Sequence, residues 1–164
     1  SFTRSSIQSE KELLAVLVTT PMRLTHYALP GMTERGSGAI INVSSVAGFI
    51  ASGSYSAAKS YLTVLSESLH TELKGSGVKV LALCPGFTRT EFHQRGRMKM
   101  GGLPKFLWLS ADDVTLCAWR DLARGKAVSI PGWQYKLLFV ITRVMPRRIV
   151  RNAGTSMNNK RRQK

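Results

Sequence analysis

Residues 38–59 read Gly-Ala-Ile-Ile-Asn-Val-Ser-Ser-Val-Ala-Gly-Phe-Ile-Ala-Ser-Gly-Ser-Tyr-Ser-Ala-Ala-Lys, and this stretch decides the fold. Residues 39–43 are mostly apolar, which is typical of a strand that a parallel sheet buries on both faces. A loop of small residues follows. Apolar side chains then recur three or four positions apart between Tyr55 and Lys74, as in an amphipathic helix. The stretch therefore predicts a strand, a loop and a helix, in that order.

The same alternation continues on both sides of this stretch. Residues 9–30 predict an earlier helix, with Pro21 bending or interrupting it and Pro30-Gly31 weakening its end. Gly75 and Gly77 close the central helix. A buried strand is predicted at 78–83, followed by an irregular segment at 87–109. A capping box at Ser110–Asp113 opens a helix to about Arg124. The last predictions are a short strand at 127–130 and an amphipathic helix from about Gln134 that Pro146 kinks or ends.

This order of elements predicts an α/β fold, the C-terminal part of a doubly wound parallel sheet in three α/β/α layers. Three strands are few for such a sheet, and an open strand edge would expose unpaired backbone groups and apolar surface. The chain also begins with Ser1 rather than methionine, so we expect missing residues. We predict one partial domain over residues 1–151 and a basic, disordered tail over residues 152–164.

The net charge of +15 is concentrated near the C-terminus. Residues 1–121 carry 13 Lys/Arg and 9 Asp/Glu, whereas residues 122–164 carry 11 Lys/Arg and no acid. Such a segment suits a basic module that binds nucleic acid or an anionic membrane surface. A solvated terminus is the favoured interpretation, since the closing residues have no interleaved aromatics, and no nucleic-acid partner is expected. For the last helix we favour docking on the protein body over peripheral membrane contact.

Cysteine and histidine usage excludes other classes of site. Cys84 and Cys117 lie in apolar runs and form no CxxC pair, which favours buried, reduced thiols and a cytoplasmic location. His26, His70 and His93 have no metal-ligand spacing, so no metal site is expected.

Three segments bring chemistry to one end of the predicted sheet. Tyr55 and Lys59 are four positions apart, so both side chains emerge from one face of the helix. An ammonium beside a phenol stabilises phenolate, which makes the tyrosine usable as a proton donor or acceptor. Ser45 follows the first strand, and Pro85-Gly86-Phe-Thr-Arg-Thr90 follows the second. Ligands bind at this carboxyl edge in open α/β sheets.

The strings Gly38–Gly48, Tyr55-Ser-Ala-Ala-Lys59 and Cys84-Pro-Gly-Phe-Thr-Arg-Thr90 together resemble the short-chain dehydrogenase/reductase family. The resemblance covers most of residues 10–132. It implies a Rossmann-like fold and an NAD(P)-dependent oxidoreductase that transfers hydride between nicotinamide and a carbonyl or alcohol substrate. The cofactor is NADP or NAD. A homo-oligomer is implied for the full-length protein, with helices matching 10–30 and 55–74 often at the dimer contact.

The resemblance assigns a role to each matched residue. Tyr55 becomes the general acid/base, Ser45 orients the substrate oxygen, and Lys59 lowers the pKa of the tyrosine and holds the nicotinamide ribose. We prefer Ser45 to Ser44 because it directly precedes the Val-Ala-Gly turn. The residues assigned to cofactor binding are Tyr55, Lys59, Pro85, Gly86, Thr88 and Thr90. Apolar residues at 98–108, including Met98, Met100 and Trp108, either line a pocket for a lipophilic substrate or pack in the core.

Three departures from the family pattern matter. Tyr55 follows Ser45 by ten positions, which is shorter than usual and fits a shorter loop. Leu17 stands where an asparagine usually completes a proton relay, and this should weaken acid–base catalysis, a contribution of roughly 10²–10⁴-fold. The Thr-Gly-x-x-x-Gly-x-Gly turn and the Asn-Asn-Ala-Gly strand end are both absent. They belong to a front portion on the order of 90 residues, at about 30 per βαβ unit. A catalytically inactive family remnant is therefore the alternative to an active enzyme.

Overall fold

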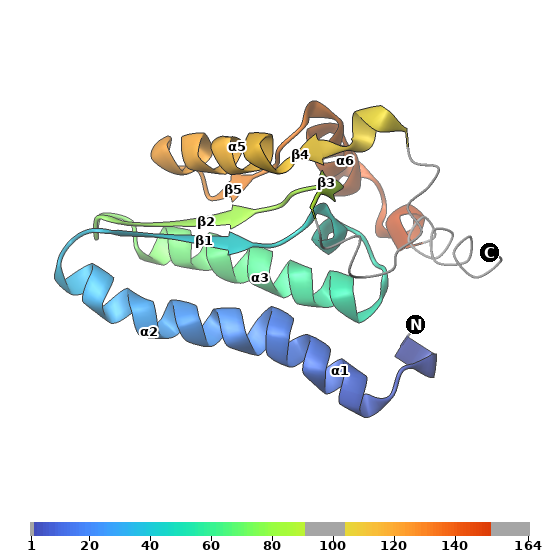
Figure 1. Cartoon of the computed structure of the whole chain (residues 1–164), viewed down its shortest axis with the longest axis horizontal. Coiled ribbons are helices and arrows are strands. Elements are labelled where there is room, and N and C mark those ends of the chain that lie inside the picture. The colour runs from blue at the N-terminus through green and yellow to red at the C-terminus, as the bar shows by residue number, and fades with distance from the viewer. Residues whose placement is uncertain (1, 91–103, 152–164) are drawn as a thin grey trace.

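The computed structural model describes residues 2–90 and 104–151, which form a three-stranded parallel sheet covered by helices on both faces (Figure 1). The central strand pairs with a parallel neighbour on each side, with Gly38 opposite Val78 and Ala82 opposite Val128. In spatial order the strands are β1 (Gly38–Val43), β2 (Val78–Leu83) and β5 (Val128–Ser129). The predicted α/β class and parallel sheet are confirmed.

Helices occupy both faces of this sheet, as Figure 1 shows. The long helical rod at the N-terminus and α3 lie below the sheet, and α5 lies above it. The helices are α1 (Ile7–Leu14), α2 (Thr20–Glu34), α3 (Gly53–Glu72), α5 (Ala111–Ala123) and α6 (Trp133–Val144). This arrangement confirms the three α/β/α layers, and α6 ends before Pro146 as the sequence predicts.

Strand β2 carries the core, because five of its six residues are buried. Its side chains alternate between the two faces. Leu81 and Leu83 meet α5 in an apolar cluster that Val114, Ala118 and Leu122 complete. The strand end joins a second cluster, in which Ala82, Cys84, Ile130 and Tyr135 pack together and α6 contributes Leu138 and Phe139. Both cysteines are free; Cys84 is buried as predicted, and Cys117 is half-buried.

The N-terminal helix is interrupted just before Pro21, as predicted, but it continues past Pro30. A π-helical turn (η2, Ala15–Thr19) joins α1 to α2, and Thr20 N–H donates to the carbonyl of Ala15. Pro21 lacks an N–H for the carbonyl four residues earlier, and the wider turn accommodates this loss without ending the helix. The predicted weakening at Pro30-Gly31 is wrong, since α2 continues to Glu34. Pro30 is exposed, so water can bond the carbonyl that its ring leaves free.

The segment predicted to be irregular contains a second, two-stranded parallel sheet. Its strands are β3 (Thr88–Arg89) and β4 (Leu109–Ser110). Ser110 then caps α5 as predicted, by accepting a 3.0 Å hydrogen bond from Asp113 N–H. Its hydroxyl donates a 2.6 Å hydrogen bond to the Asp113 carboxylate, which takes the place of the reach-back bond of a capping box. The residues between 91 and 103, with Met98 and Met100, lie outside the described residues, as does the predicted tail at 152–164.

Strand β1 is an edge strand, since β2 is its partner in the described part of the chain. A groove of about 510 Å³ runs along it, between β1 and the long helical rod formed by η2 and α2, residues 15–34, which we call the α2 rod. Val43, at the end of β1, is 54% exposed. The open edge expected from three strands is therefore present, next to the residues assigned to chemistry.

Candidate functional site

The loops that leave β1 and β2 meet at the carboxyl edge of the sheet. Val46 N–H donates a 3.1 Å hydrogen bond to the carbonyl of Pro85. Parallel pairing of β1 with β2 brings these two strand ends together. Ser45 and the Pro85-Gly86 turn therefore lie side by side, as the sequence predicts.

The two neighbouring serines have different environments. Ser44 is buried, and its hydroxyl lies 2.7 Å from both the carbonyl of Lys59 and the hydroxyl of Thr63. These bonds fasten α3 to the end of β1. Ser45 is half-buried and accepts a 3.1 Å hydrogen bond from Ala47 N–H. Its hydroxyl also interacts with Tyr55, so Ser45 faces the tyrosine and Ser44 holds the scaffold.

Tyr55 lies in the first turn of α3, with 39% of its surface exposed. Burial raises the pKa of its phenol, and the Ser45 hydroxyl partly offsets this by lowering the pKa. The net direction is opposite to the lowering expected from Lys59. The phenol therefore holds its proton at neutral pH.

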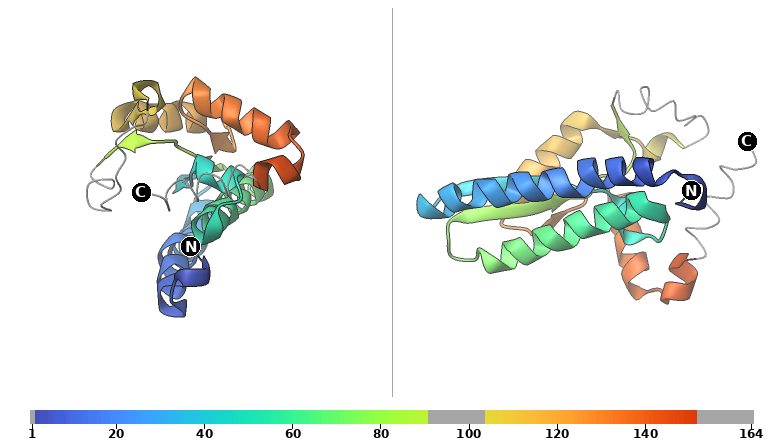
Figure 2. Two further views of the ribbon diagram at one scale, coloured as in Figure 1. Left: turned by 90° about the vertical axis from the view of Figure 1, so that its right-hand side faces the viewer. Right: turned by 90° about the horizontal axis from the view of Figure 1, so that it is seen from below.

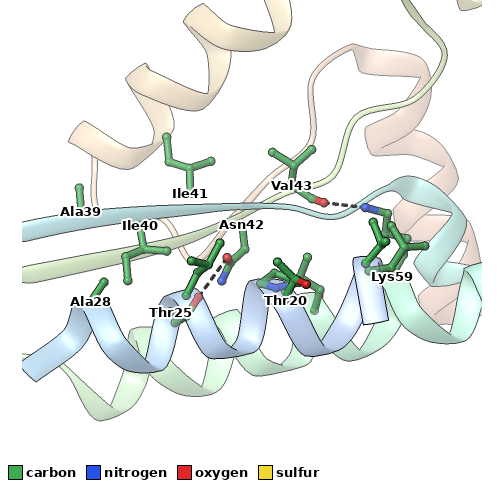
Figure 3. Close-up of a pocket in the computed structure, with 14 residues that line it drawn as sticks. Thr20, Thr25, Ala28, Ala39, Ile40, Ile41, Asn42, Val43 and Lys59 are labelled. Atoms are coloured by element: carbon green, nitrogen blue, oxygen red, sulfur yellow. Dashed lines mark hydrogen bonds between the residues drawn. The ribbon is translucent and has the colours of Figure 1, made fainter. Parts of the chain in front are cut away.

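Lys59 is buried one helical turn later, and its Nζ lies 5.8 Å from the centroid of the Tyr55 ring. The ammonium donates a 2.8 Å hydrogen bond to the carbonyl of Val43 (Figure 3). Burial lowers the pKa of this lysine. Among the described residues, no acceptor bonds its other two N–H donors. A buried ammonium with unused donors points to a ligand with hydroxyl or carbonyl acceptors.

The residues after Pro85 have structural partners of their own. A side chain at Gly86 would overlap the ring of Tyr135. The Tyr135 hydroxyl accepts a 3.0 Å hydrogen bond from Phe87 N–H and donates to the carbonyl of Leu107. Tyr135 thus explains why position 86 is glycine. Its role depends on tertiary contact, and the sequence reading missed it.

The two threonines of this segment differ in exposure. Thr88 is half-buried in β3 and donates a 3.2 Å hydrogen bond to the carbonyl of Gly86. Thr90 is exposed, one residue beyond the strand. Both threonines therefore lie just after the Pro85-Gly86 turn, where the chain passes from β2 of the main sheet into β3 of the two-stranded sheet.

The groove beside β1 reaches this site, as Figure 3 shows. Lys59 and Leu62 of α3, Asn42 and Val43 of β1 and residues of the α2 rod line it. Leu17, in the π-helical turn, is one of these lining residues. The Leu17 side chain therefore faces the same groove as Lys59, and it offers no hydrogen bond there.

A buried polar network supports the site from below, and the sequence reading missed it. Asn42 is buried in β1 and donates a 3.0 Å hydrogen bond to Ser66 of α3. Thr25 of α2 donates a longer bond of 3.4 Å to its side-chain oxygen. An asparagine inside an apolar strand was the available signal, because a buried amide needs partners. The network ties both lower helices to the edge strand.

The arrangement fits one end of a nicotinamide nucleotide. The buried Lys59 ammonium with unused donors and the partly exposed Tyr55 hydroxyl face the sheet edge where ribose and nicotinamide groups bind in α/β folds. A pyrophosphate needs a glycine-rich turn between a strand and a helix N-terminus. The 164 residues contain no such turn, so the residues present fit the nicotinamide–ribose end alone.

The described ranges, 2–90 and 104–151, contain no cluster of three or more His, Cys, Asp or Glu residues with the geometry to hold a metal ion. Within them, no helix combines the length and the apolar character needed to cross a bilayer.

Comparisons with known proteins agree with this geometry. Residues 1–100 match the family described as short chain dehydrogenase. An uncharacterized oxidoreductase of Myxococcus xanthus is 37% identical over 122 residues, covering 72% of this chain and 46% of the relative.

Two solved structures are similar to this one. A short-chain dehydrogenase from Sphingobium yanoikuyae in complex with NADPH superposes with a TM-score of 0.74 at 29% identity, covering 84% of this chain and 56% of that chain. A bulky-bulky ketone specific alcohol dehydrogenase from Comamonas testosteroni superposes with a TM-score of 0.69 at 27% identity. The match covers 84% of this chain and 54% of that chain. The chain thus spans about half the length of the relatives it matches.

Proposed function

Because the chain belongs to the short-chain dehydrogenase family, we propose that Ser45, Tyr55 and Lys59 are the proton-transfer centre of an NAD(P)-dependent oxidoreductase. The observation that carries this proposal is the meeting of all three side chains where β1 and β2 end. The bound nicotinamide supplies or accepts the hydride. The chain's own residues position the reacting carbon and handle the proton.

Tyr55 is the proton donor when a carbonyl is reduced. Burial keeps its phenol protonated at neutral pH, which is the state that reduction requires. The Ser45 hydroxyl, beside it, donates a hydrogen bond to the same substrate oxygen and orients it. In the reverse direction Tyr55 accepts the proton of an alcohol, and that direction becomes favourable as pH rises.

Lys59 holds the ribose of the cofactor through the N–H donors that have no bond within the described residues. Its bond to Val43 fixes the ammonium against the end of β1. Thr88 and Thr90 lie on the segment that follows the Pro85-Gly86 turn, and we assign their hydroxyls to contacts with the nicotinamide end. We assign the cofactor as NADP or NAD, and the similar dehydrogenase from Sphingobium yanoikuyae is in complex with NADPH.

The substrate class we propose is a lipophilic ketone, aldehyde or alcohol. Phe87 and Trp108 form a ring pair with centroids 5.9 Å apart, and the exposed Phe106 lies close by in sequence. These rings provide apolar surface beside the sheet edge. The similar alcohol dehydrogenase from Comamonas testosteroni is specific for bulky-bulky ketones.

A catalytically inactive remnant is the second candidate. It rests on Leu17, which places an apolar side chain in the groove beside Lys59. Under this alternative the chain keeps the geometry of the centre but turns over no substrate.

Turnover with a matched pair of variants separates the two candidates. We expect the chain to oxidise NADPH or NADH when a bulky ketone is present, and Tyr55→Phe to lower the rate by roughly 10²–10⁴-fold. Tyr61→Phe is the control, since Tyr61 lies on the same helix with the same 39% exposure. Equal rates for Tyr55→Phe and wild type would refute the assignment of Tyr55. No turnover by the wild-type chain would show that these 164 residues alone do not turn over substrate, as the second candidate expects.

A further inference from the structure

Helix α6 is apolar on two opposite sides. One side faces the protein, where Tyr135, Leu138 and Phe139 pack into the cluster at the end of β2. Phe139 also meets Phe49 with ring centroids 4.7 Å apart. Docking on the body, the sequence-based expectation, is therefore confirmed for this side.

The opposite side of α6 is apolar and exposed. Its residues recur at intervals of three or four, so they form one stripe along the helix. We call them the α6 outer stripe: Trp133, Leu137, Val140, Ile141 and Val144, with exposed fractions of 70, 53, 54, 40 and 80%. Figure 2 shows α6 projecting at the side of the molecule away from α1 and α2. An exposed apolar stripe of this kind on a surface helix marks a site of contact with another protein or with a membrane.

Cations flank the α6 outer stripe along one edge and beyond its C-terminal end. Lys136 lies along that edge, as does Arg143, whose guanidinium lies 5.0 Å from the centroid of the Phe139 ring. Residues 147–151 continue the positive charge with Arg147 and Arg148. The sequence contains no Asp or Glu after Asp121. One acid from elsewhere approaches: Glu67 of α3 lies 3.9 Å from Arg143, a long and half-exposed pair. The surroundings of the stripe therefore carry a strong positive charge.

A second copy of the chain is a poor occupant for this surface. A two-fold contact places the same patch of each subunit against itself. It would bring Lys136, Arg147 and Arg148 of one copy against the cations of the other, with no acid in residues 122–164 to compensate. Anionic lipid headgroups, in contrast, neutralise the cations while acyl chains take up the apolar stripe. Tryptophan also prefers the boundary between these two regions.

We propose that the α6 outer stripe and its flanking cations dock this protein on an anionic lipid surface, with α6 lying in the plane of the interface. The contact is independent of the oxidoreductase chemistry. The contact holds the protein at the membrane surface, where lipophilic substrates concentrate. Tyr55, at the carboxyl edge of the sheet, is thereby brought to that surface.

Vesicle binding by the whole chain tests this proposal. Phosphatidylcholine vesicles containing phosphatidylglycerol should bind the chain, and phosphatidylcholine alone should bind it much more weakly. Added salt should weaken the binding to the anionic vesicles. Tryptophan emission should shift to shorter wavelength on binding, and Trp133→Phe should remove most of that shift.

Two double variants separate the apolar and charged contributions. Val140→Gln/Val144→Gln keeps helix propensity and charge, and should weaken binding by roughly tenfold or more. Its control is Ile7→Gln/Val64→Gln, which changes two residues that are 71 and 61% exposed on other helices. Arg147→Gln/Arg148→Gln should weaken binding about 25-fold, at about fivefold per cation. Its control is Arg4→Gln/Lys74→Gln, two exposed cations elsewhere.

Several outcomes would overturn the proposal. One is no binding to anionic vesicles, and another is binding that Val140→Gln/Val144→Gln leaves unchanged while deletion of residues 152–164 abolishes it. Sedimentation velocity gives a third: a dimer that the same double variant dissociates would assign the stripe to a second copy. Duplex DNA binding without vesicle binding would assign the cations to nucleic acid. Circular dichroism checks that each variant keeps its fold.

Discussion

Lys59 Nζ donates a 2.8 Å hydrogen bond to the carbonyl of Val43, the last residue of the edge strand β1. This bond joins the lysine assigned to cofactor binding to the strand end that carries Ser45. The position of the charge in the site therefore depends on how β1 ends. The burial that positions the ammonium also lowers its pKa, so the site holds a charge at a cost in stability.

We predict that Lys59→Met raises the free energy of unfolding by about 1 kcal/mol at neutral pH, because it removes a buried charge at a functional site. Val43 is half-exposed, so water replaces the lost hydrogen bond to its carbonyl. Folding lowers the pKa of Lys59, so the buried ammonium reduces the free energy of unfolding at neutral pH. This cost is relieved as pH rises through the pKa that Lys59 has in the folded state. The gain from Lys59→Met should therefore shrink at alkaline pH. Urea unfolding measures it, with the exposed Lys74→Met as control; a loss of stability in Lys59→Met would contradict the prediction.

Tyr55 should titrate above the ordinary tyrosine value of about 10 in the 164-residue chain. Ser45→Ala should raise that pKa further, since it removes the interaction that lowers it. Folding raises the pKa of the phenol, so this group's contribution to the free energy of unfolding is fully present below its pKa in the unfolded chain. The contribution is lost as pH rises through the pKa in the folded state. Carbon-13 labelled tyrosine, followed by NMR and assigned with Tyr55→Phe, gives the titration. A Tyr55 pKa below 10 would show that Lys59, and not burial, dominates the site.

Gly86→Ala should destabilise the protein by about 1–3 kcal/mol through overpacking, because its methyl group overlaps the Tyr135 ring. The double variant Gly86→Ala/Tyr135→Leu should recover part of this loss, since a smaller side chain leaves room for the methyl group. Thermal unfolding of both single variants and the double variant gives the coupling free energy. Strictly additive losses would mean that position 86 is glycine for another reason, such as close approach of a cofactor.

Asn42→Ala should cost about 1–3 kcal/mol, because it leaves buried hydroxyls of Thr25 and Ser66 without the amide between them. Val64→Ala is the control, an exposed position on α3 that should change stability by less than about 0.5 kcal/mol. Urea unfolding compares the two. A cost for Asn42→Ala as small as that of the control would show that the network does not hold the α2 rod to β1.

Local patterns predicted the elements well where packing agrees with propensity. The run at 78–83 became β2 with those bounds, and the helix expected from Tyr55 begins two residues earlier, at Gly53. Pro30 does not weaken the helix, because it lies on the exposed side of α2, where water can bond the carbonyl that its ring leaves free. The pair β3 and β4 was missed because two-residue strands leave no periodic signal.

Site prediction was limited by contacts distant in sequence. The spacing of Tyr55 and Lys59 predicted their shared helix face, and strand pairing placed Ser45 beside them. The reason for glycine at position 86 lies in Tyr135 on α6, which no local pattern connects with it. The direction of the Tyr55 pKa shift depends on burial, and burial is a property of the folded chain.

Binding of reduced nicotinamide mononucleotide tests the central claim most directly, because this half-cofactor needs only the residues that the chain contains. Amide NMR of the 164-residue chain should show shift changes at Ser45, Tyr55 and Lys59, and Lys59→Met should abolish them while the fold persists. Adenosine monophosphate, the other half of the cofactor, should leave these signals unchanged. No shift changes with the nicotinamide nucleotide, or changes that persist in Lys59→Met, would contradict a nicotinamide site built on Ser45, Tyr55 and Lys59.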